Sequence, residues 1–453
     1  MKQINCFLLL FFVVISFGCN SLEKNNSLTK EEKINQIITR IQLPQIGPSL
    51  VNIEDFGAIG DGVANCKPAI DAAILEASSQ GGGKVIFPAG TYFCKGPIHL
   101  ESKINLHLEK GCTVLFSQDD KDYLPVQLVR WEGVEIYNYS PYIYAINKTD
   151  IAITGEGKLD GNADGSIRNW RSKQKPSQSM VRKMGHELVP VKERVFGEDH
   201  FLRFSFIQFL HCENILISDL TIENVPFWVM HPTYCKSITI KDVNVNCPSI
   251  NNDGIDFDSC EDALVEDCTF NCGDDAIVIK SGRDDDAWRV NKPSRNIVIR
   301  NCLANEVLHG LAFGSEMSGG IENIYIDNFY MKNVKQYAIQ FKANRDRGGY
   351  IRDVFIDGVF IDTTKTAVYF TNDYHGYQGG NSPSEFYNID IKNIICAQAN
   401  GSAIDIKGLK KNPIHHVTLE NITVLNEDKP SIAINTENCI SKNVSIGGNE
   451  FLY

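Results

Sequence analysis

The sequence lacks a basic surplus, a long apolar run and any low-complexity tract. Its 44 Lys and Arg residues face 56 Asp and Glu, and a net charge of -12 excludes nucleic acid or an anionic membrane surface as the main partner, because both require a basic face. The most apolar stretch, from Cys6 to Phe17, is too short for a membrane-spanning helix. No Pro/Ser-rich linker divides the 453 residues, so we expect one continuous folded body.

The cysteines show no zinc-binding pattern. Fourteen are scattered along the chain, and the closest grouping, Cys260, Cys268 and Cys272, has no CxxC pair and no nearby histidine. We predict buried free thiols or occasional disulfides, with no metal and no cofactor. The glycines at 81–83 lack the Lys-Ser/Thr ending of a phosphate loop, which argues against nucleotide binding.

The first residues have the features of an export signal. Lys2, the apolar run and Gly18-Cys19 are similar to a signal peptide with a bacterial lipoprotein box, in which Cys19 becomes lipidated. Simple signal removal and a retained anchor remain alternatives. We therefore predict an exported protein of a Gram-negative bacterium, periplasmic or anchored to the outer membrane only by that lipid. The predicted division is 1–19 signal, 20–48 tether or surface helix, and 49–453 folded domain.

A short phrase of strand, polar bend and second strand recurs from about residue 150. Apolar and polar residues alternate within each strand, and Asn or Asp, with Gly, falls at the bend, where the backbone must turn sharply. The period, roughly 23 to 35 residues, is typical of solenoids. The copies are 150–157, 213–224, 236–247, 261–272, 295–306, 322–333, 352–363, 387–398 and 415–426.

These repeats predict an all-β, single-domain, right-handed parallel β-helix. Helical patterns are almost absent between the copies, which excludes an alternating strand and helix fold. A β-propeller is the second choice, but its blades need a regular period of about 40 residues. The exposed end of a solenoid needs a cap, and the spacing of apolar residues predicts a short capping helix at Lys67 to Ser79.

Two acidic clusters fall in consecutive repeats, at 251–256 and 272–275. Equivalent positions of neighbouring coils lie on top of one another, so Asp253, Asp274 and Asp275 are expected to converge. Crowded carboxylates raise one another's pKa, which separates an acid from a base, as cleavage of a glycosidic bond requires. We interpret Asp256 and Asp258 as ordinary turn residues.

Further candidate residues follow in the next two repeats. His309 is placed to hydrogen-bond the acid, and Lys342 supplies positive charge for an anionic sugar, as would Arg345 and Arg347. The charged loop 283–289 offers Trp288 to stack on a sugar ring.

Together these motifs resemble glycoside hydrolase family 28, the polygalacturonase family of pectin hydrolases, over nearly the whole mature chain. The active-site motifs of that family are Asn-x-Asp, Asp-Asp, Gly-His-Gly and Arg-Ile-Lys; the N-terminal segments DFGA, GDG and PAGTY are also similar. The resemblance implies an inverting hydrolase of α-linked galacturonic acid-containing bonds, of polygalacturonase, galacturonidase or rhamnogalacturonan type, acting on a pectic polysaccharide or oligosaccharide.

The resemblance also implies roles for individual residues. Asp274 matches the general acid, and Asp253 and Asp275 match the two carboxylates that activate water. His309 matches the histidine that supports the acid, although Leu308 replaces the first glycine. The implied substrate-binding residues are Lys342, Gln340 and Tyr374. Separately from the resemblance, Arg289 of the charged loop is a candidate to meet a sugar carboxylate.

Gln340 is the main departure, because the family has arginine there to grip a sugar carboxylate. Its lack of charge favours a mixed or branched pectin as substrate. A polysaccharide lyase with a calcium-bound acidic cluster is the alternative function, and a non-catalytic glycan-binding rod is a more distant one. We expect a monomer; endo or exo action stays open.

Overall fold

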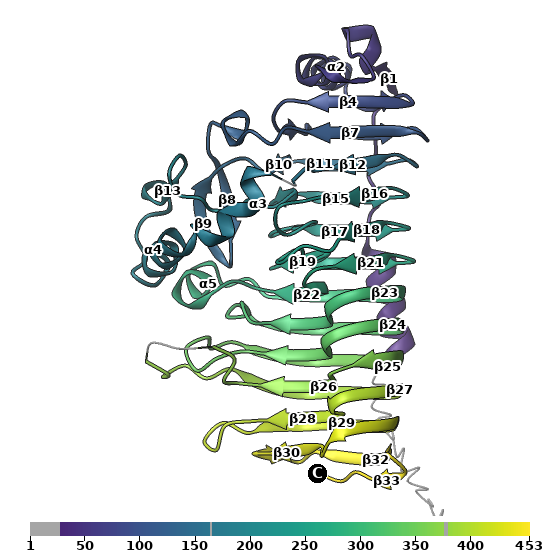
Figure 1. The fold of residues 1–453 in the computed structure, drawn as a ribbon, viewed down its shortest axis with the longest axis vertical. Helices are drawn as coiled ribbons and strands as arrows, with labels where there is room; N and C mark the ends of the chain where they lie inside the picture. Colours follow the sequence, from purple (N-terminus) through teal and green to yellow (C-terminus); the bar gives the residue numbers. More distant parts are fainter. Residues whose placement is uncertain (1–27, 164, 376–378) are drawn as a thin grey trace, which may run out of the picture.

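The computed structural model describes residues 28–163, 165–375 and 379–453. Their strands stack into one long coil, the right-handed parallel β-helix that the repeats predict (Figure 1). Almost every strand pairs in parallel with the equivalent strand of the next coil, so each coil has the same three faces.

The first coils carry separate strands on each face. On one face lie β1 (Ser49–Asn52), β3 (Gly83–Phe87), β6 (Ile104–Leu108), β11 (Thr149–Thr154), β15 (Glu213–Ser218), β17 (Lys236–Lys241) and β20 (Glu261–Glu266). The second face has β2 (Asp61–Asn65), β4 (Gly90–Cys94), β7 (Cys112–Phe116), β12 (Lys158–Asp160), β16 (Thr221–Glu223), β18 (Asn244–Cys247) and β21 (Thr269–Cys272). The third has β5 (Ile98–His99), β10 (Ile143–Ile146), β14 (Ile207–Leu210), β19 (Ile255–Asp258) and β22 (Asp275–Lys280).

From β23 onward, five strands are longer and run through the bends: β23, β24, β25, β27 and β29. The strands of these later coils are β23 (Ser294–Gly314), β24 (Ile321–Lys342), β25 (Tyr350–Thr364), β26 (Thr366–Thr371), β27 (Glu385–Ser402), β28 (Ile404–Lys407), β29 (Ile414–Lys429), β30 (Ile432–Ile434), β31 (Thr436–Glu437), β32 (Ile440–Ile446) and β33 (Asn449–Glu450). The third face continues through the ends of β23 and β24 into β26, β28 and β30.

The polar bends of the repeat adopt the left-handed backbone conformation. Asp219, Asp242 and Asp267 have φ angles of 66°, 52° and 57° at equivalent points of three coils. Asn and Asp tolerate this conformation better than other residues with a side chain, which explains their recurrence in the sequence. In later coils the bend amides also bond to each other, as Asn328 Nδ2 does to Asn301 Oδ1 at 2.8 Å.

The core fills the inside of the coil with stacked apolar side chains. The rings of Phe313, Phe341 and Phe370 lie parallel on successive coils, with centroids 4.4 and 4.2 Å apart. This stacking fixes the register of the third face. The twelve cysteines in the described residues are all free and eleven of them are buried, as the sequence predicts.

Two helices close and brace the coil. The predicted cap is confirmed as α2 (Lys67–Ser79), whose Ile70 and Ala73 are fully buried at the first coil. In the stretch predicted as a tether or surface helix, α1 (Lys30–Arg40) lies along the outside of the coil and packs Ile37 against Leu264, Val298 and Tyr325. The predicted signal and lipid site lie outside the described residues.

Our expectation that helices are almost absent between the repeats was wrong. A side layer stands beside the third face (Figure 1, left). It contains β8 (Gln127–Trp131), β9 (Val134–Asn138), β13 (Val195–Phe196), α3 (Ser166–Asn169), α4 (Lys175–His186) and α5 (Asp284–Val290). α5 replaces the predicted charged loop. Four short 3-10 helices are η1 (Ile53–Phe56), η2 (Asp120–Tyr123), η3 (Trp170–Ser172) and η4 (Val191–Glu193).

None of the helices in the described part of the chain is long and apolar enough to cross a membrane.

Candidate active site

The register of the third face brings the predicted acids to one place. Asp274 and Asp275 lie where β22 begins, and Asp275 pairs in register with His309 of β23 on the next coil. The N–H of Gly254, next to Asp253, donates to the carbonyl of Asp275 at 2.9 Å. All three carboxylates line one cavity of about 250 Å³, the acid cavity, together with Lys342 and Tyr374. The structure therefore gathers these acids as the sequence predicts.

Asp275 is the most strongly held of the three. It is 2% exposed, and its carboxylate accepts from His309 Nδ1 at 2.6 Å and from Lys342 Nζ at 3.0 Å. Burial raises the pKa of Asp275, but the positive charges of Lys342 and then His309 lower it by more than burial raises it. The pKa of Asp275 therefore lies below its ordinary value. Asp275 therefore stays ionised under acidic conditions, as a base must.

Asp274 is the most accessible of the acids, with 17% of its side chain exposed. Asn251 Nδ2 donates to its Oδ2 at 3.2 Å, and His309 Nδ1 lies 3.5 Å from its Oδ1. His309 was expected to support this acid, yet it lies closer to Asp275. Burial lowers the pKa of His309, but the carboxylates of Asp275 and Asp274 outweigh burial and raise it.

Asp253 shares a buried network that the sequence does not reveal. Lys280 Nζ lies 2.9 Å from Asp256 Oδ1 and 3.5 Å from Asp253 Oδ2. Burial, and then Asp256, raise the pKa of Asp253 well above its ordinary value, and burial raises that of Asp256 to about 7. Oδ1 of Asp253 has no hydrogen-bond partner among the described residues, which leaves it able to accept from water.

Our interpretation of Asp256 and Asp258 as turn residues was wrong. Both lie in β19 and are fully buried. Asp256 pairs with Lys280, and Asp258 forms a buried ion pair with Arg130 Nη1 at 2.8 Å, which ties the β8–β9 hairpin to the coil. Removing one partner of such a pair costs about 3–5 kcal/mol, so these acids hold the walls of the site together.

Two of the predicted substrate-binding residues do not line the acid cavity. Gln340 is fully buried in β24. Arg289 lies on α5, where its Nη2 pairs with Glu135 and also with Asp286 at 3.1 Å. The structure thus places Arg289 in the contact between α5 and β9, and it meets carboxylates of the protein itself.

Lys342 and Tyr374 do lie together at the acid cavity. The ammonium of Lys342 is 5.5 Å from the centre of the Tyr374 ring, within the range of a cation–π contact. Arg347 also reaches the acid cavity, whereas Arg345 pairs with Asp373 at 3.0 Å on an exposed segment.

Several lining residues were missed by sequence reasoning. They are Glu132, Arg182, Lys280, Arg283, Glu316 and Asn344. Glu132 and Arg182 belong to the side layer, whose place beside the coil no repeat predicts. Lys280 ends the same strand that Asp275 begins, and a lysine closing an otherwise apolar strand was a signal that could have been used.

Asp274, Asp275 and His309 also have the composition of a small metal site. One ligand atom from each lies within 4.8 Å of the others. The ammonium of Lys342, 3.0 Å from Asp275, places a positive charge beside the same oxygens and would repel a divalent cation. The donor set thus fits a proton-transfer site better than calcium.

Replacing Lys342 with Met should move the acidic limb of the kcat/KM profile to higher pH. Lys342 holds the pKa of Asp275 down, so its removal raises that pKa and a higher pH is needed to ionise the carboxylate. The measurement is kcat/KM against pH, with Lys365→Met, an exposed lysine bonded to Gln336, as control. An unmoved limb would count against Asp275 as the base.

Gln340→Leu is expected to stabilise the fold. Both amide atoms of Gln340 are buried without a hydrogen-bond partner among the described residues, and removing such atoms should raise the free energy of unfolding by about 1 kcal/mol. Urea denaturation tests the stability, and steady-state kinetics should give an unchanged KM. A less stable variant with a raised KM would show that Gln340 serves the substrate after all.

The fold and the site define a class of enzyme. A parallel β-helix that holds an accessible carboxyl group beside a buried, ionised carboxylate, in a cavity rich in basic side chains, is a glycoside hydrolase.

Comparison with known proteins identifies the family. Residues 198–444 match the family described as Glycosyl hydrolases family 28, and the chain belongs to it. Residues 50–108 match a second description, Rhamnogalacturonase A/epimerase, pectate lyase-like. The lyase alternative is not supported.

Individual relatives agree with this assignment. The crystal structure of a hyperthermoactive exopolygalacturonase from Thermotoga maritima is 35% identical with a TM-score of 0.87, covering 93% of this chain and 97% of that one. A probable polygalacturonase of Vitis vinifera is 29% identical over 387 residues, which are 82% of this chain and 74% of the relative. An exo-poly-alpha-D-galacturonosidase of Dickeya chrysanthemi is 26% identical over 411 residues, or 82% and 66% of the two chains.

Proposed function

We propose that this enzyme removes galacturonate from the ends of pectic chains by hydrolysing α-linked galacturonosyl bonds with inversion. The observation that carries the proposal is the acid cavity, in which the three carboxylates lie among five basic side chains. The basic residues are Arg182, Lys280, Arg283, Lys342 and Arg347. Such surroundings suit a sugar that bears a carboxylate, and the relatives named for polygalacturonan cleavage support the same substrate class.

The catalytic steps follow from the exposure and the partners of the three carboxyl groups. Asp274, the accessible acid, donates its proton to the leaving glycosidic oxygen. Asp275, which stays ionised, draws a proton from water on the opposite face of the sugar ring. Asp253 helps to hold that water through its free Oδ1. His309 and Lys342 keep Asp275 charged and in place.

The walls around the cavity favour action at a chain end. A second cavity of about 490 Å³, the outer cavity, shares four residues with the acid cavity. Its walls come from α4, from α5 and the residue before it, and from the segments 344–347 and 379–382, all outside the strands of the coil. Walls of this kind obstruct a long polymer that would lie across the coil and suit a chain end that enters a pocket.

The mixed-pectin hypothesis loses its structural basis. It rested on Gln340 as a sugar contact, but Gln340 lines neither cavity. The rhamnogalacturonase-like match covers residues 50–108 only, which contain none of the acids. Unbranched galacturonan is therefore the substrate we propose.

Product analysis tests the proposed function. The enzyme is incubated with galacturonate oligomers of defined length that carry a label at the reducing end, and the products are separated over time. End-directed action predicts free monogalacturonate as the first product, with oligomers shortened one unit at a time. Early release of mixed internal fragments would refute end-directed action, and an unsaturated uronate product would refute hydrolysis.

Export and lipid attachment at Cys19 remain part of the proposal. They concern residues outside the described part of the chain. Growth of the producing cells with labelled palmitate should label the wild type and leave the Cys19→Ala variant unlabelled. The expected monomeric state also stays a prediction.

A further inference from the structure

Gln340 is uncharged and buried where the family has an arginine, so another group must bind the sugar carboxylate. Lys342, the predicted sugar contact, already forms an ion pair with Asp275. The acid cavity and the outer cavity meet at four shared residues, Arg182, Arg283, Asn344 and Arg347. Three of these four are arginines, and they come from separate parts of the chain: α4, the residue before α5, and the segment after β24.

Each of the three guanidinium groups is held from one side. Arg182 Nη2 donates to Glu132 at 2.8 Å, and Arg283 donates from Nε to the Glu132 carbonyl at 2.9 Å and from Nη2 to Glu316 at 2.5 Å. Arg347 donates from Nε to the carbonyl of Ser315 at 2.6 Å and from Nη1 to Asp284. One terminal nitrogen of each group, Nη1 of Arg182, Nη1 of Arg283 and Nη2 of Arg347, has no bonded partner among the described residues.

Each guanidinium group is paired with one carboxylate, so what remains at the junction of the cavities is the unbonded N–H donors of fixed cations. Arg283 and Arg347 are 8% and 2% exposed, so water screens their mutual repulsion poorly. Burial, and then the neighbouring charge of Arg283, lower the pKa of Arg347. Asp284 and Glu316 already relieve this repulsion from the protein side. A substrate carboxylate would therefore be held here by hydrogen bonds from the unbonded nitrogens.

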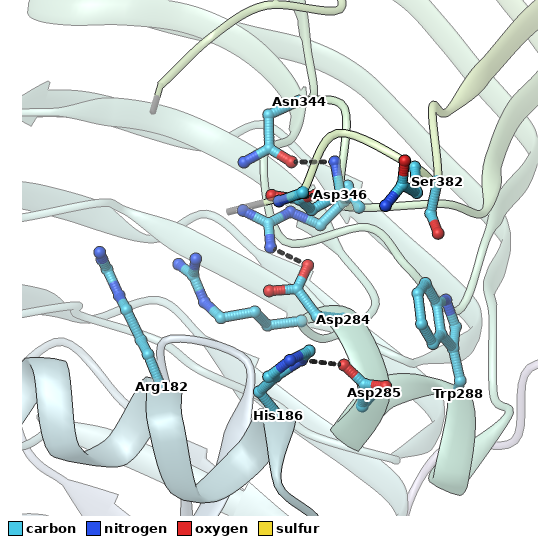
Figure 2. A pocket seen from close by; sticks show the side chains of 12 residues that line it. Arg182, His186, Asp284, Asp285, Trp288, Asn344, Asp346 and Ser382 are labelled. Carbon is cyan, nitrogen blue, oxygen red and sulfur yellow. Dashed lines mark hydrogen bonds and ion pairs between the residues drawn. The ribbon is translucent and has the colours of Figure 1, made fainter. Parts of the chain in front are cut away.

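The side of the outer cavity away from the arginines is lined by an aromatic ring and a histidine–aspartate pair. Figure 2 shows Arg182 reaching into the cavity from α4, with Trp288 on the opposite wall. His186 pairs with Asp285 at 2.6 Å between them, and the indole of Trp288 is 40% exposed. The guanidinium groups thus mark the point of the pocket where a carboxylate is best accommodated.

We propose that Arg182, Arg283 and Arg347 form the carboxylate-binding site for a galacturonate ring through their unbonded terminal nitrogens, in place of an arginine at position 340. The two buried arginines are fixed by Glu316 and Asp284, and the more exposed Arg182 closes the site from α4. This inference rests on the proposed galacturonan hydrolysis and names the residues that select its substrate.

The test is Arg182→Gln, assayed with galacturonate oligomers. Arg182 has 37% of its side chain exposed and lies on a helix of the side layer, so the variant should fold. KM should rise roughly 10- to 100-fold, the effect of one lost charge-assisted hydrogen bond, while kcat changes less than threefold. Arg182→Lys, which keeps the charge but loses the planar fork, should give a smaller rise in KM.

Lys183→Gln is the matched control, because Lys183 is the next residue of α4 and its exposed ammonium lies 3.7 Å from Glu187. Its KM should equal that of the wild type. A KM of Arg182→Gln within twofold of the wild type, or an equal rise in the Lys183→Gln control, would overturn the inference. Wild-type enzyme that releases no galacturonate would instead overturn the proposed function.

Discussion

Asp274→Asn is expected to lower kcat/KM on galacturonate oligomers by about 10²- to 10⁴-fold, the usual contribution of a general acid. Asparagine keeps the shape of the side chain but cannot donate a proton to the leaving oxygen. A substrate with an acidic leaving group, such as a nitrophenyl galacturonide, needs little protonation, so the variant should recover most of its rate there. Steady-state kinetics on the two substrates measures this difference.

A surface aspartate provides the control for Asp274→Asn. Asp373 has 50% of its side chain exposed and pairs with Arg345, so Asp373→Asn should change kcat/KM less than twofold on either substrate. Equal losses for Asp274→Asn on the oligomer and on the nitrophenyl substrate would contradict its role as the acid.

Asp275→Asn is expected to lose a similar factor, about 10²- to 10⁴-fold, with no recovery on the activated substrate. Asp275 takes a proton from the attacking water, and a better leaving group does not remove the need for that step. The variant also leaves Lys342 and His309 without their carboxylate, and an unpaired buried cation costs about 3–5 kcal/mol. Its thermal midpoint should therefore fall, and activity must be measured below that midpoint.

A double variant separates catalysis from folding at Asp275. Asp275→Asn combined with Lys342→Met removes both partners of the ion pair, which is far less costly than removing one. The double variant should regain most of the lost stability and remain as inactive as Asp275→Asn. Activity that returns together with stability would show that Asp275 only supports the fold.

The parts of the fold that the repeat determines could be predicted from the sequence. Strand alternation and left-handed bends such as Asp242 recur in each coil, so the repeat determines both the coil and the stacking of its faces. The convergence of Asp253, Asp274 and Asp275 follows from that stacking alone. The cap α2 could be predicted as well, because its apolar spacing is helical and solenoid ends need covering.

The side layer could not be predicted in the same way. α4 has one fully buried apolar residue, Val181, and its place beside the coil depends on tertiary contacts with β9 and α5. Arg182 therefore reaches the cavity by a route that no periodicity shows. Asp256 looked like a turn residue because its partner, Lys280, comes from the next coil.

The alternation of apolar and polar residues also does not reveal which side chains of one face reach the cavity and which are covered. Gln340 and Lys342 lie two residues apart on β24 and so share a face, yet Lys342 reaches the acid cavity and Gln340 does not. A motif position thus indicated the correct strand but the wrong contact.

The configuration of the first product tests the central claim most directly. Asp274 and Asp275 acting as acid and base in one step must invert the anomeric carbon, so proton NMR in the first minutes of hydrolysis of an α-linked galacturonate oligomer should show the β-anomer before mutarotation. First appearance of the α-anomer would mean a covalent intermediate, and would contradict the assignment of these two carboxylates.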